Sequence, residues 1–259
     1  MPRFIAAGNW KMNTTLPEAK ALALAIPKAL NGPPPSHVET IICPPYISLA
    51  VVRDALRGSG IVVGAQNAHW EQKGAFTGEV SPSMLKDLCE YVIVGHSERR
   101  HVMGESDDTI NRKVKAVYAA GLKPILCVGE TLEQRQRDGA EGVVRRQLES
   151  GLNGVRDISE LVIAYEPVWA IGTGVAATPD TVREITSGAI RAEIAKLHGS
   201  DIADEVPVLY GGSANPDNAS GFLKEPSIQG TLIGGASLNA EQFAKIVRLT
   251  AEIKGGSVK

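Results

Sequence analysis

Short apolar runs alternate with longer amphipathic segments from one end of the chain to the other. The short runs are rich in Val, Ile and Ala and are continuous rather than alternating, which is typical of parallel strands covered on both faces. The predicted strands are 4–8, 38–43, 61–65, 91–95, 124–128, 161–165, 206–210 and 231–233. Segments of helical periodicity between them include 18–30, 47–56, 109–120, 143–152 and 181–197. Eight strand–helix units in succession predict an α/β protein whose parallel sheet is covered by helices on its outer face.

The number of units favours one closed barrel over an open doubly wound sheet. A chain of 259 residues has the usual size of a single-domain (β/α)8 barrel, and eight units complete one barrel. The proline run at 33–35 is too short for a linker, and the chain has no second zone of composition. We therefore predict one domain over residues 1–259, with eight parallel strands.

Charge and cysteine content bear on the partners and the compartment. The formal net charge is −2 and Lys and Arg are spread along the chain, so we expect no nucleic-acid and no membrane partner. The N-terminus has no apolar signal region, and no apolar run reaches membrane-spanning length. The three separated cysteines, Cys43, Cys89 and Cys127, indicate reduced thiols in a cytoplasmic protein. The five histidines lack the spacing of a metal cluster, so we expect no metal.

Polar and glycine residues follow most of the predicted strands at their carboxyl ends, where barrels of this kind carry their active sites. These residues are Asn9 and Lys11 after the first strand, Gln66 and Asn67 after the third, His96 after the fourth, Glu166 after the sixth, Gly211 to Ser213 after the seventh and Gly234 to Ser237 after the eighth. Because the strands of a barrel end at one face, we expect these residues to share a site.

The sixth strand ends on a single carboxylate. Glu166 is followed by Pro167, which removes a backbone donor, and then by an apolar loop with glycines that ends at a helix start, 178–180. Removal from water makes a carboxylate a stronger base, so this arrangement suits proton transfer under a lid. A solvated glutamate at a strand end, with Trp169 as ordinary packing, explains this stretch about equally well on its own.

Lys11 and His96 are candidates for the chemistry around that acid. Most lysines lie in solvent, but the place of Lys11 at a strand end favours an inward cation for an anionic substrate. His96 precedes a plausible helix start at Ser97, and the positive end of a helix dipole favours a neutral ring that donates a hydrogen bond. Taken alone, His96 fits better as a histidine buried for structural reasons.

Two glycine pairs, 211–212 and 234–235, follow the last two strands. Barrels often hold phosphate at this place with backbone N–H groups, and glycine permits the close approach that this requires. One pair alone would be explained by a tight turn, but two in consecutive units favour phosphate. The stretch 172–177 fits a loose dinucleotide pattern, but 167–171 separates it from the strand, so we expect no nicotinamide and no other cofactor.

Five motifs together resemble the triosephosphate isomerase family, in the order that the family has them. They are 8–13 (GNWKMN), 94–100 (VGHSERR), 164–174 (AYEPVWAIGTG), 210–213 (YGGS) and 234–238 (GGASL). The resemblance extends from about Phe4 to the last helix. It implies an α/β, single-domain (β/α)8 TIM barrel that interconverts dihydroxyacetone phosphate and D-glyceraldehyde 3-phosphate through an enediolate, in glycolysis and gluconeogenesis.

The resemblance also implies a role for each site residue. Glu166 would be the catalytic base and neutral His96 the electrophile, while Lys11 and Asn9 would bind substrate and stabilise the enediolate charge. Ser97 and Glu98 would support the site, with Glu98 orienting Lys11. The expected phosphate-binding residues are Gly172, Ser213, Gly234 and Gly235. The expected lid consists of Pro167, Val168, Trp169, Ala170, Ile171, Thr173, Gly174 and Val175.

A homodimer follows from the same resemblance, because 72–79, which includes Thr77, is similar to a loop that inserts into a partner subunit.

Three positions depart from the family pattern. Met103 replaces a frequent aromatic residue, Ala214 a usual valine and Gln229 a common aspartate, which puts a supporting hydrogen bond in doubt. Two other interpretations are another phosphosugar barrel, which would lack Lys11, His96 and Glu166 together, and a non-catalytic barrel with a binding or structural role.

Overall fold

The strands close into one parallel barrel. The computed structural model describes residues 3–170 and 177–256. Each strand pairs in parallel with the next, and the eighth pairs with the first, so the order around the barrel is the order in the chain. The strands are β1 (Phe4–Asn9), β2 (Val38–Cys43), β3 (Val62–Ala65), β4 (Tyr91–Val94), β5 (Lys123–Val128), β6 (Val162–Tyr165), β7 (Val208–Tyr210) and β8 (Gly230–Ile233). The predicted fold class is therefore confirmed.

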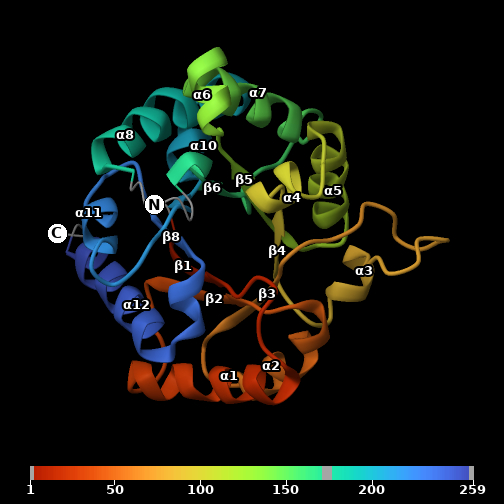
Figure 1. The fold of residues 1–259 in the computed structure, drawn as a ribbon, viewed down its shortest axis with the longest axis vertical. Coiled ribbons are helices and arrows are strands. Elements are labelled where there is room, and N and C mark those ends of the chain that lie inside the picture. Colours follow the sequence, from red (N-terminus) through yellow and green to blue (C-terminus); the bar gives the residue numbers. More distant parts are fainter. Residues whose placement is uncertain (1–2, 171–176, 257–259) are drawn as a thin grey trace.

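The strands are apolar on both faces because each face packs against other side chains. Alternate residues point inward and form one buried cluster inside the barrel: Ile5, Ala7, Ile41, Cys43, Tyr91, Ile93, Ile125, Cys127, Val162, Ala164, Leu209 and Leu232. The residues between them, such as Ala6, Ile42 and Val92, belong to a second cluster that also contains the buried faces of the helices. Figure 1 shows the strands at the centre with the helices in a ring around them.

The helices lie between the strands as the periodicity predicts, with differences at their ends. They are α1 (Leu16–Leu30), α2 (Leu49–Ala55), α3 (Pro82–Leu85), α4 (Ser97–His101), α5 (Asp107–Ala119), α6 (Leu132–Asp138), α7 (Ala140–Leu152), α8 (Pro179–Arg183), α9 (Ala192–His198), α10 (Ser200–Glu205), α11 (Ala219–Leu223) and α12 (Ala240–Gly255). Shorter or irregular turns are η1 (Tyr46–Ser48), η2 (Val168–Ala170), the π-helix η3 (Glu184–Arg191) and η4 (Gly235–Leu238).

The predicted boundaries were wrong where local chemistry overrides periodicity. The first helix begins two residues early, at Leu16, where the Glu18 carboxylate accepts a hydrogen bond from the Thr15 N–H at 2.8 Å. The segment predicted as one helix over 181–197 is divided between α8, η3 and α9. The seventh strand begins at Val208 because Pro207 has no N–H to donate.

The departure at Gln229 preserves a hydrogen-bonded connection. The Gln229 Oε1 accepts from the Arg191 guanidinium and from the Val208 N–H (3.0 Å), while its Nε2 donates to the Pro226 carbonyl at 2.8 Å. Burial lowers the pKa of Arg191, with the charge of Asp204 acting in the opposite direction. Gln229 therefore makes the supporting contacts that its identity put in doubt.

Replacement of Gln229 by leucine is expected to lower the free energy of unfolding by about 2–5 kcal/mol. The change leaves the Arg191 guanidinium and the Val208 N–H without this acceptor, and each unsatisfied buried group costs about 1–3 kcal/mol. Denaturant unfolding of the two proteins measures the difference. A loss below about 0.5 kcal/mol, the usual effect of a surface change, would contradict this account of Gln229.

Candidate active site

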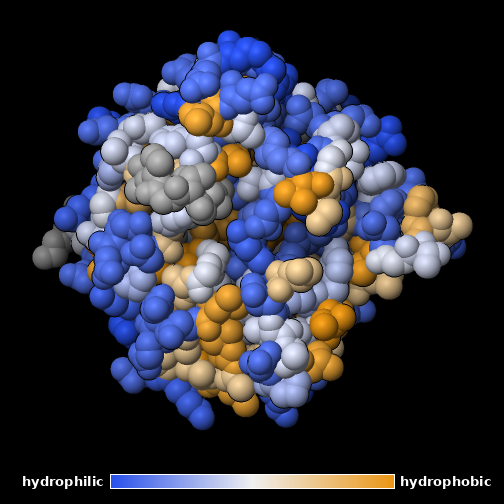
Figure 2. Space-filling model, viewed as in Figure 1, coloured by the Kyte–Doolittle hydropathy of each residue, from blue (hydrophilic) through white to orange (hydrophobic). Residues whose placement is uncertain are grey.

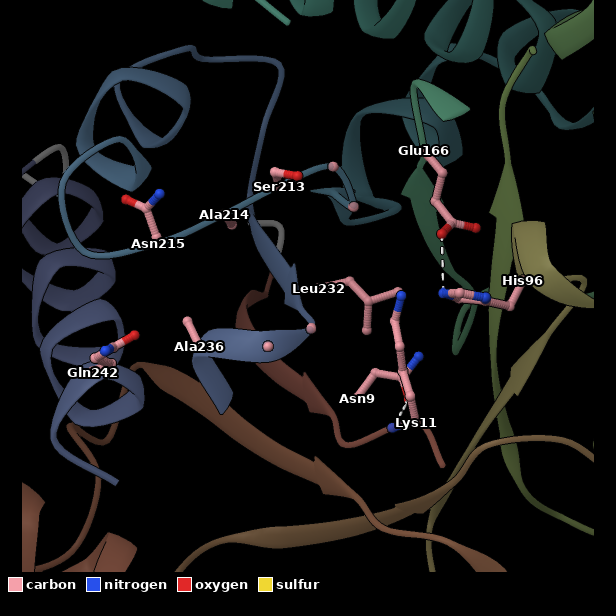
Figure 3. A pocket seen from close by; sticks show the side chains of 14 residues that line it. Asn9, Lys11, His96, Glu166, Ser213, Ala214, Asn215, Leu232, Ala236 and Gln242 are labelled. Carbon is pink, nitrogen blue, oxygen red and sulfur yellow. Dashed lines mark hydrogen bonds and ion pairs between the residues drawn. The ribbon is translucent and has the colours of Figure 1, made fainter. Parts of the chain in front are cut away.

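The carboxyl ends of the strands surround a cavity of about 380 Å³. Its walls include Asn9, Lys11, His96 and Glu166 on one side and the two glycine loops on the other (Figure 3). Ser213, Gly234 and Gly235 also line it. The structure thus brings together residues from β1, β4, β6, β7 and β8 that are far apart in the chain. The other phosphate-binding candidate, Gly172, lies outside the described residues.

Glu166 is buried at the end of β6 and both of its carboxylate oxygens are hydrogen-bonded. Its Oε2 accepts from the Ser97 N–H at 2.9 Å, and its Oε1 accepts from the Ser97 hydroxyl at 3.0 Å. The His96 Nε2 lies 3.0 Å from the same Oε1. Because Glu166 is only 1% exposed, the interpretation as a solvated glutamate is wrong.

The two ring nitrogens of His96 have different partners. The Glu98 N–H donates to Nδ1 at 3.3 Å, as expected for the N-cap position that His96 takes before α4. An N–H donor at Nδ1 requires a lone pair there, so the proton of the neutral ring is on Nε2, the nitrogen that faces Glu166. In this tautomer the Nε2–H group is directed at the Glu166 carboxylate, 3.0 Å away.

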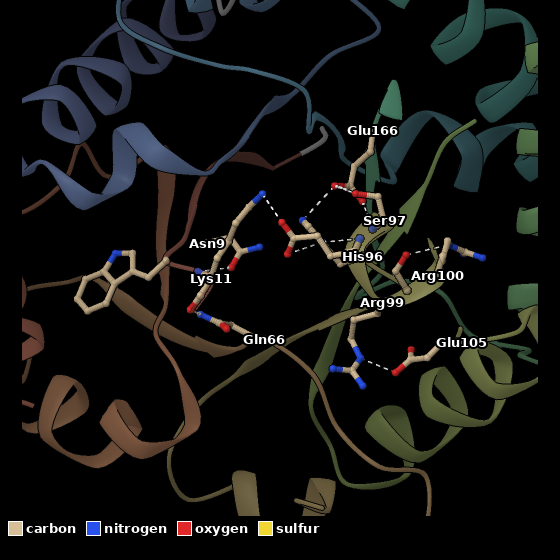
Figure 4. A network of polar contacts seen from close by, with 12 residues as sticks. Asn9, Lys11, Gln66, His96, Ser97, Arg99, Arg100, Glu105 and Glu166 are labelled. Carbon is tan, nitrogen blue, oxygen red and sulfur yellow. Dashed lines mark hydrogen bonds and ion pairs between the residues drawn. The ribbon is translucent and has the colours of Figure 1, made fainter. Parts of the chain in front are cut away.

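Lys11 reaches the cavity through an uncommon backbone conformation. Its φ of 53° lies in the left-handed region, which a residue with a side chain adopts only when its surroundings hold it there. The Asn9 Oδ1 accepts from the Lys11 N–H at 3.0 Å, and the Gln66 Nε2 donates to the Lys11 carbonyl at 2.8 Å (Figure 4). These two side chains hold the peptide groups on both sides of the Lys11 Cα.

The charge of Lys11 is paired with Glu98. The Lys11 Nζ lies 2.7 Å from the Glu98 Oε1. Partial burial alone would raise the pKa of the Glu98 carboxyl, but the hydrogen bond from Lys11 and nearby positive charge outweigh it and lower the pKa below its usual value. Glu98 is therefore ionised at neutral pH and keeps the ammonium group at the edge of the cavity.

The glycine loop after β8 lies beside this cation. A Cβ at Gly234 would lie 3.5 Å from the Lys11 Cε, an ordinary van der Waals distance, so the Gly234 backbone is next to the lysine side chain. The turn η4 begins directly after Gly234, and its first residues line the cavity. The backbone N–H groups at the start of a helical turn are suited to bind an anion. Backbone N–H groups beside a lysine are a suitable environment for a phosphate group.

The first part of the expected lid, Pro167 to Ala170, packs against a buried acid that the sequence analysis did not single out. Glu130 is fully buried, and its carboxylate accepts from the Trp169 indole at 2.8 Å, from the Tyr165 hydroxyl at 3.2 Å and from Arg135 at 3.0 Å. Ser213 donates to the Ala170 carbonyl at 3.3 Å. Glu130 could have been found from the sequence, because it follows the fifth predicted strand just as the other candidate residues follow theirs. The lid residues Ile171, Thr173, Gly174 and Val175 lie outside the described residues.

Thr77 lies away from this cavity, in the exposed segment 71–79 between β3 and α3. Figure 1 shows this segment extending outward from the barrel. The His69 ring lies 4.0 Å from the Trp70 ring and 4.4 Å from the Phe76 ring, centre to centre. This aromatic stack gives the segment a defined shape although it is exposed.

Comparison with known proteins relates the whole chain to one family. A sequence model of the family described as triosephosphate isomerase matches residues 4–250. A triosephosphate isomerase of Chlorobium phaeovibrioides is 52% identical over 249 residues, covering 96% of this chain and 99% of that protein. One of Carboxydothermus hydrogenoformans is 50% identical over 245 residues, covering 93% and 96%. One of Dehalococcoides mccartyi is 46% identical over 254 residues, covering 98% and 100%.

Proposed function

The chain belongs to the triosephosphate isomerase family, and on this basis we propose a role for each residue around the cavity. The reaction is the interconversion of dihydroxyacetone phosphate and D-glyceraldehyde 3-phosphate, in glycolysis and gluconeogenesis. The observation that carries the proposed roles is the convergence of Glu166, His96 and Lys11 on one cavity beside the glycine loops. A base, a neutral donor, a cation and a phosphate site are the groups that this reaction requires.

Glu166 takes a proton from the carbon beside the carbonyl group and returns it to the neighbouring carbon. The electrons of the broken C–H bond form the enediolate, so no redox partner is needed and we expect no cofactor. Both carboxylate oxygens are engaged by Ser97 and His96. The carboxylate must therefore leave Ser97 to reach the substrate carbons, and Ser97 supports it until then.

His96 donates from Nε2 to the substrate oxygen on which negative charge develops. A neutral imidazole is a weak acid, so it stabilises the enediolate by a hydrogen bond while it moves protons between the two oxygens. The Lys11 ammonium group and the Asn9 amide stabilise the same charge. Glu98 keeps Lys11 in place through the 2.7 Å ion pair.

The phosphate group binds at the opposite wall of the cavity. Backbone N–H groups of Ser213, Gly234 and Gly235, together with Gly172, hold it. The lid, which comprises Pro167, Val168, Trp169, Ala170, Ile171, Thr173, Gly174 and Val175, closes over the bound substrate and excludes water. Energy from phosphate binding, remote from the reacting carbons, favours closure.

An isomerase assay coupled to a triose phosphate dehydrogenase tests this function on the pure protein. We expect turnover in both directions with added triose phosphates and no added metal or cofactor for the isomerase. Activity at background level with both substrates would favour a non-catalytic barrel. Activity on a longer phosphosugar alone would favour another phosphosugar isomerase.

We also propose a homodimer in which the exposed segment 71–79 of each copy binds beside the active site of the other. A second cavity, of about 270 Å³, is lined by Tyr46, Gln66 and Glu98 next to Lys11. The strongly exposed side chains of Met12 (96%) and Met103 (64%) also line it, and their exposed apolar neighbours in the chain of lining residues are Ile47 (73%), after Tyr46, and Val102 (73%), before Met103. Figure 2 shows hydrophobic surface both on the projecting segment and around the barrel face. A protrusion and an apolar hollow on one chain suit a twofold interface.

Replacement of Thr77 by arginine is expected to weaken this dimer at least tenfold. A guanidinium group carried into the partner's cavity would lose its water and meet the positive charges of Lys11 and Arg99, because the Glu98 carboxylate there is already paired with Lys11. We expect a cost of about 2–5 kcal/mol. Sedimentation velocity over a dilution series measures the dissociation constant. Leu132→Arg, at another exposed position (54%), is the control and should leave the mass unchanged. A monomeric wild type, or equal dimerisation by both variants, would contradict the proposed interface.

We further propose that residues 1–259 form one catalytic domain that acts in the cytoplasm. The three cysteines are buried free thiols, which suits a reducing compartment. Among the described residues, no helix combines the length and the apolar character needed to cross a membrane. The same residues contain no cluster of three or more His, Cys, Asp or Glu that could hold a metal ion.

A further inference from the structure

The backbone of Gly129 lies directly against the backbone of Glu166. The Glu166 N–H donates to the Val128 carbonyl at 2.8 Å, and the Val168 N–H donates to the Glu130 carbonyl at 3.1 Å. Between these two bonds, a Cβ on residue 129 would lie 1.7 Å from the Glu166 carbonyl oxygen. The segments 128–130 and 166–168 therefore continue the pairing of β5 with β6 beyond the strands, and only glycine fits at 129.

A single side chain holds Gly129 from the other direction. Gln147, from α7, is 3% exposed, and its amide pairs with both backbone groups of Gly129. The Gln147 Oε1 accepts from the Gly129 N–H at 2.7 Å, and its Nε2 donates to the Gly129 carbonyl at 3.0 Å. Two such bonds fix the orientation of one residue as a neighbouring strand would.

We propose that Gln147 is a positioning residue for the isomerisation: it fixes Gly129, and through Gly129 the backbone that carries the base Glu166 and the lid anchor Glu130. The inference rests on the proposed role of Glu166. Gln147 does not line the 380 Å³ cavity, so it acts through the backbone and not by contact with substrate. Small displacements of a catalytic group cost large factors in rate, which makes such support necessary.

The proposal predicts an effect on kcat rather than on KM. Three of the four proposed phosphate-binding residues, Ser213, Gly234 and Gly235, follow β7 and β8 rather than β5 or β6. Loosening Gly129 displaces the base and the anchor of Trp169 but leaves the backbone of these three residues in place. A purely structural role for Gln147 would lower the stability of the fold and leave kcat of the folded enzyme unchanged.

Gln147→Glu tests this proposal, because the neutral and the ionised form of the new carboxyl group can be compared in one variant. A neutral carboxylic acid can accept from the Gly129 N–H and donate to its carbonyl, as the amide does, whereas an ionised carboxylate cannot donate and repels the carbonyl. Besides the introduced glutamate, two acids lie next to Gly129. They are Glu130, which is paired with Arg135, and Glu166. We expect the ratio of kcat for the variant to kcat for the wild type to fall about tenfold or more as the pH rises from 5.5 to 9.

A second variant and a matched control complete the experiment. Gln147→Met cannot make either bond and should have a kcat about tenfold or more below the wild type at every pH, with KM within about twofold. Asn111→Asp is the control, because Asn111 is also a buried amide, which donates to the Gly151 and Asn153 carbonyls at 2.9 and 3.0 Å. It should lose stability as the pH rises while kcat per folded enzyme stays constant.

The outcomes separate this inference from the proposed function. A flat kcat ratio for Gln147→Glu, within twofold of the wild type, overturns the positioning role, as does a pH-dependent fall that Asn111→Asp reproduces. If Gln147→Met does not fold, the pH profile of Gln147→Glu decides alone, because its neutral form keeps both bonds. An inactive wild type would instead refute the proposed function itself.

Discussion

Replacement of Glu166 by aspartate is expected to lower kcat about 100-fold or more and to leave KM little changed. The substitution keeps the carboxylate but shortens its reach by one methylene group, so the base stands farther from the substrate carbon. A catalytic group that is misplaced by about 1 Å can lose about 100-fold in rate, and the phosphate contacts that dominate binding are untouched. The loss is therefore confined to the chemical step.

Steady-state kinetics of the pure variant measure this effect. Glu160→Asp is a suitable control, because Glu160 precedes β6 at the amino end of the barrel and pairs with Arg3 at 3.0 Å. It shortens a carboxylate in the same way and should leave both constants unchanged. A Glu166→Asp enzyme with normal kcat and a raised KM would contradict the assignment of Glu166 as the base.

Lys11→Met is expected to lower kcat/KM about 1,000-fold, with a lower kcat and a higher KM. The ammonium group faces the anionic substrate in the ground state and the enediolate in the transition state, so its removal weakens both. Loss of one electrostatic contact of this kind costs about 100- to 1,000-fold in kcat alone. The ion pair with Glu98 is also lost, which leaves a carboxylate at the mouth of the cavity to repel the substrate.

Kinetics over a range of salt concentrations check this second prediction. Lys20→Met, an exposed lysine on α1, removes the same charge elsewhere and should have no effect beyond about twofold. If Lys11→Met keeps the efficiency of the wild type, Lys11 has no part in the reaction. Circular dichroism shows whether the variant keeps the secondary structure of the wild type, and so whether methionine is tolerated at this unusual backbone position.

The barrel could be predicted because each strand is a continuous apolar run between turn residues. Such runs occur only where both faces of a strand are covered, and eight of them leave little choice of architecture. The division of 181–197 into α8, η3 and α9 could not be predicted, because a π-helix keeps the apolar residues at nearly helical spacing. Val206 and Pro207 are apolar like the strand that follows, but the Val206 N–H donates to the Ile202 carbonyl at the end of α10 and Pro207 has no N–H, so the strand begins at Val208.

The cavity residues at strand ends could be predicted from their position, and the supporting Ser97 and Glu98 from the family resemblance, whereas the contact of Gln147 with Gly129 could not. Glu166, His96 and Lys11 stand out because they are polar residues at the ends of apolar strands. Gln147 does not, because a glutamine within an amphipathic helix usually faces solvent, and only the structure shows it turned toward Gly129. The hydrogen bonds from Ser97 to the Glu166 carboxylate also have no sign of their own in the sequence.

A crystal structure with 2-phosphoglycolate, whose carboxylate mimics the charge of an enediolate, shows whether these residues act together on one ligand. We expect the phosphate group on the backbone N–H groups of Ser213, Gly234 and Gly235, with the Glu166 carboxylate released from Ser97 and facing the ligand carbons. His96 Nε2 and Lys11 Nζ should both lie within hydrogen-bond distance of the ligand oxygens. A ligand bound at another place, or a Glu166 carboxylate still bonded to Ser97 beside a ligand in the cavity, would contradict the proposed roles.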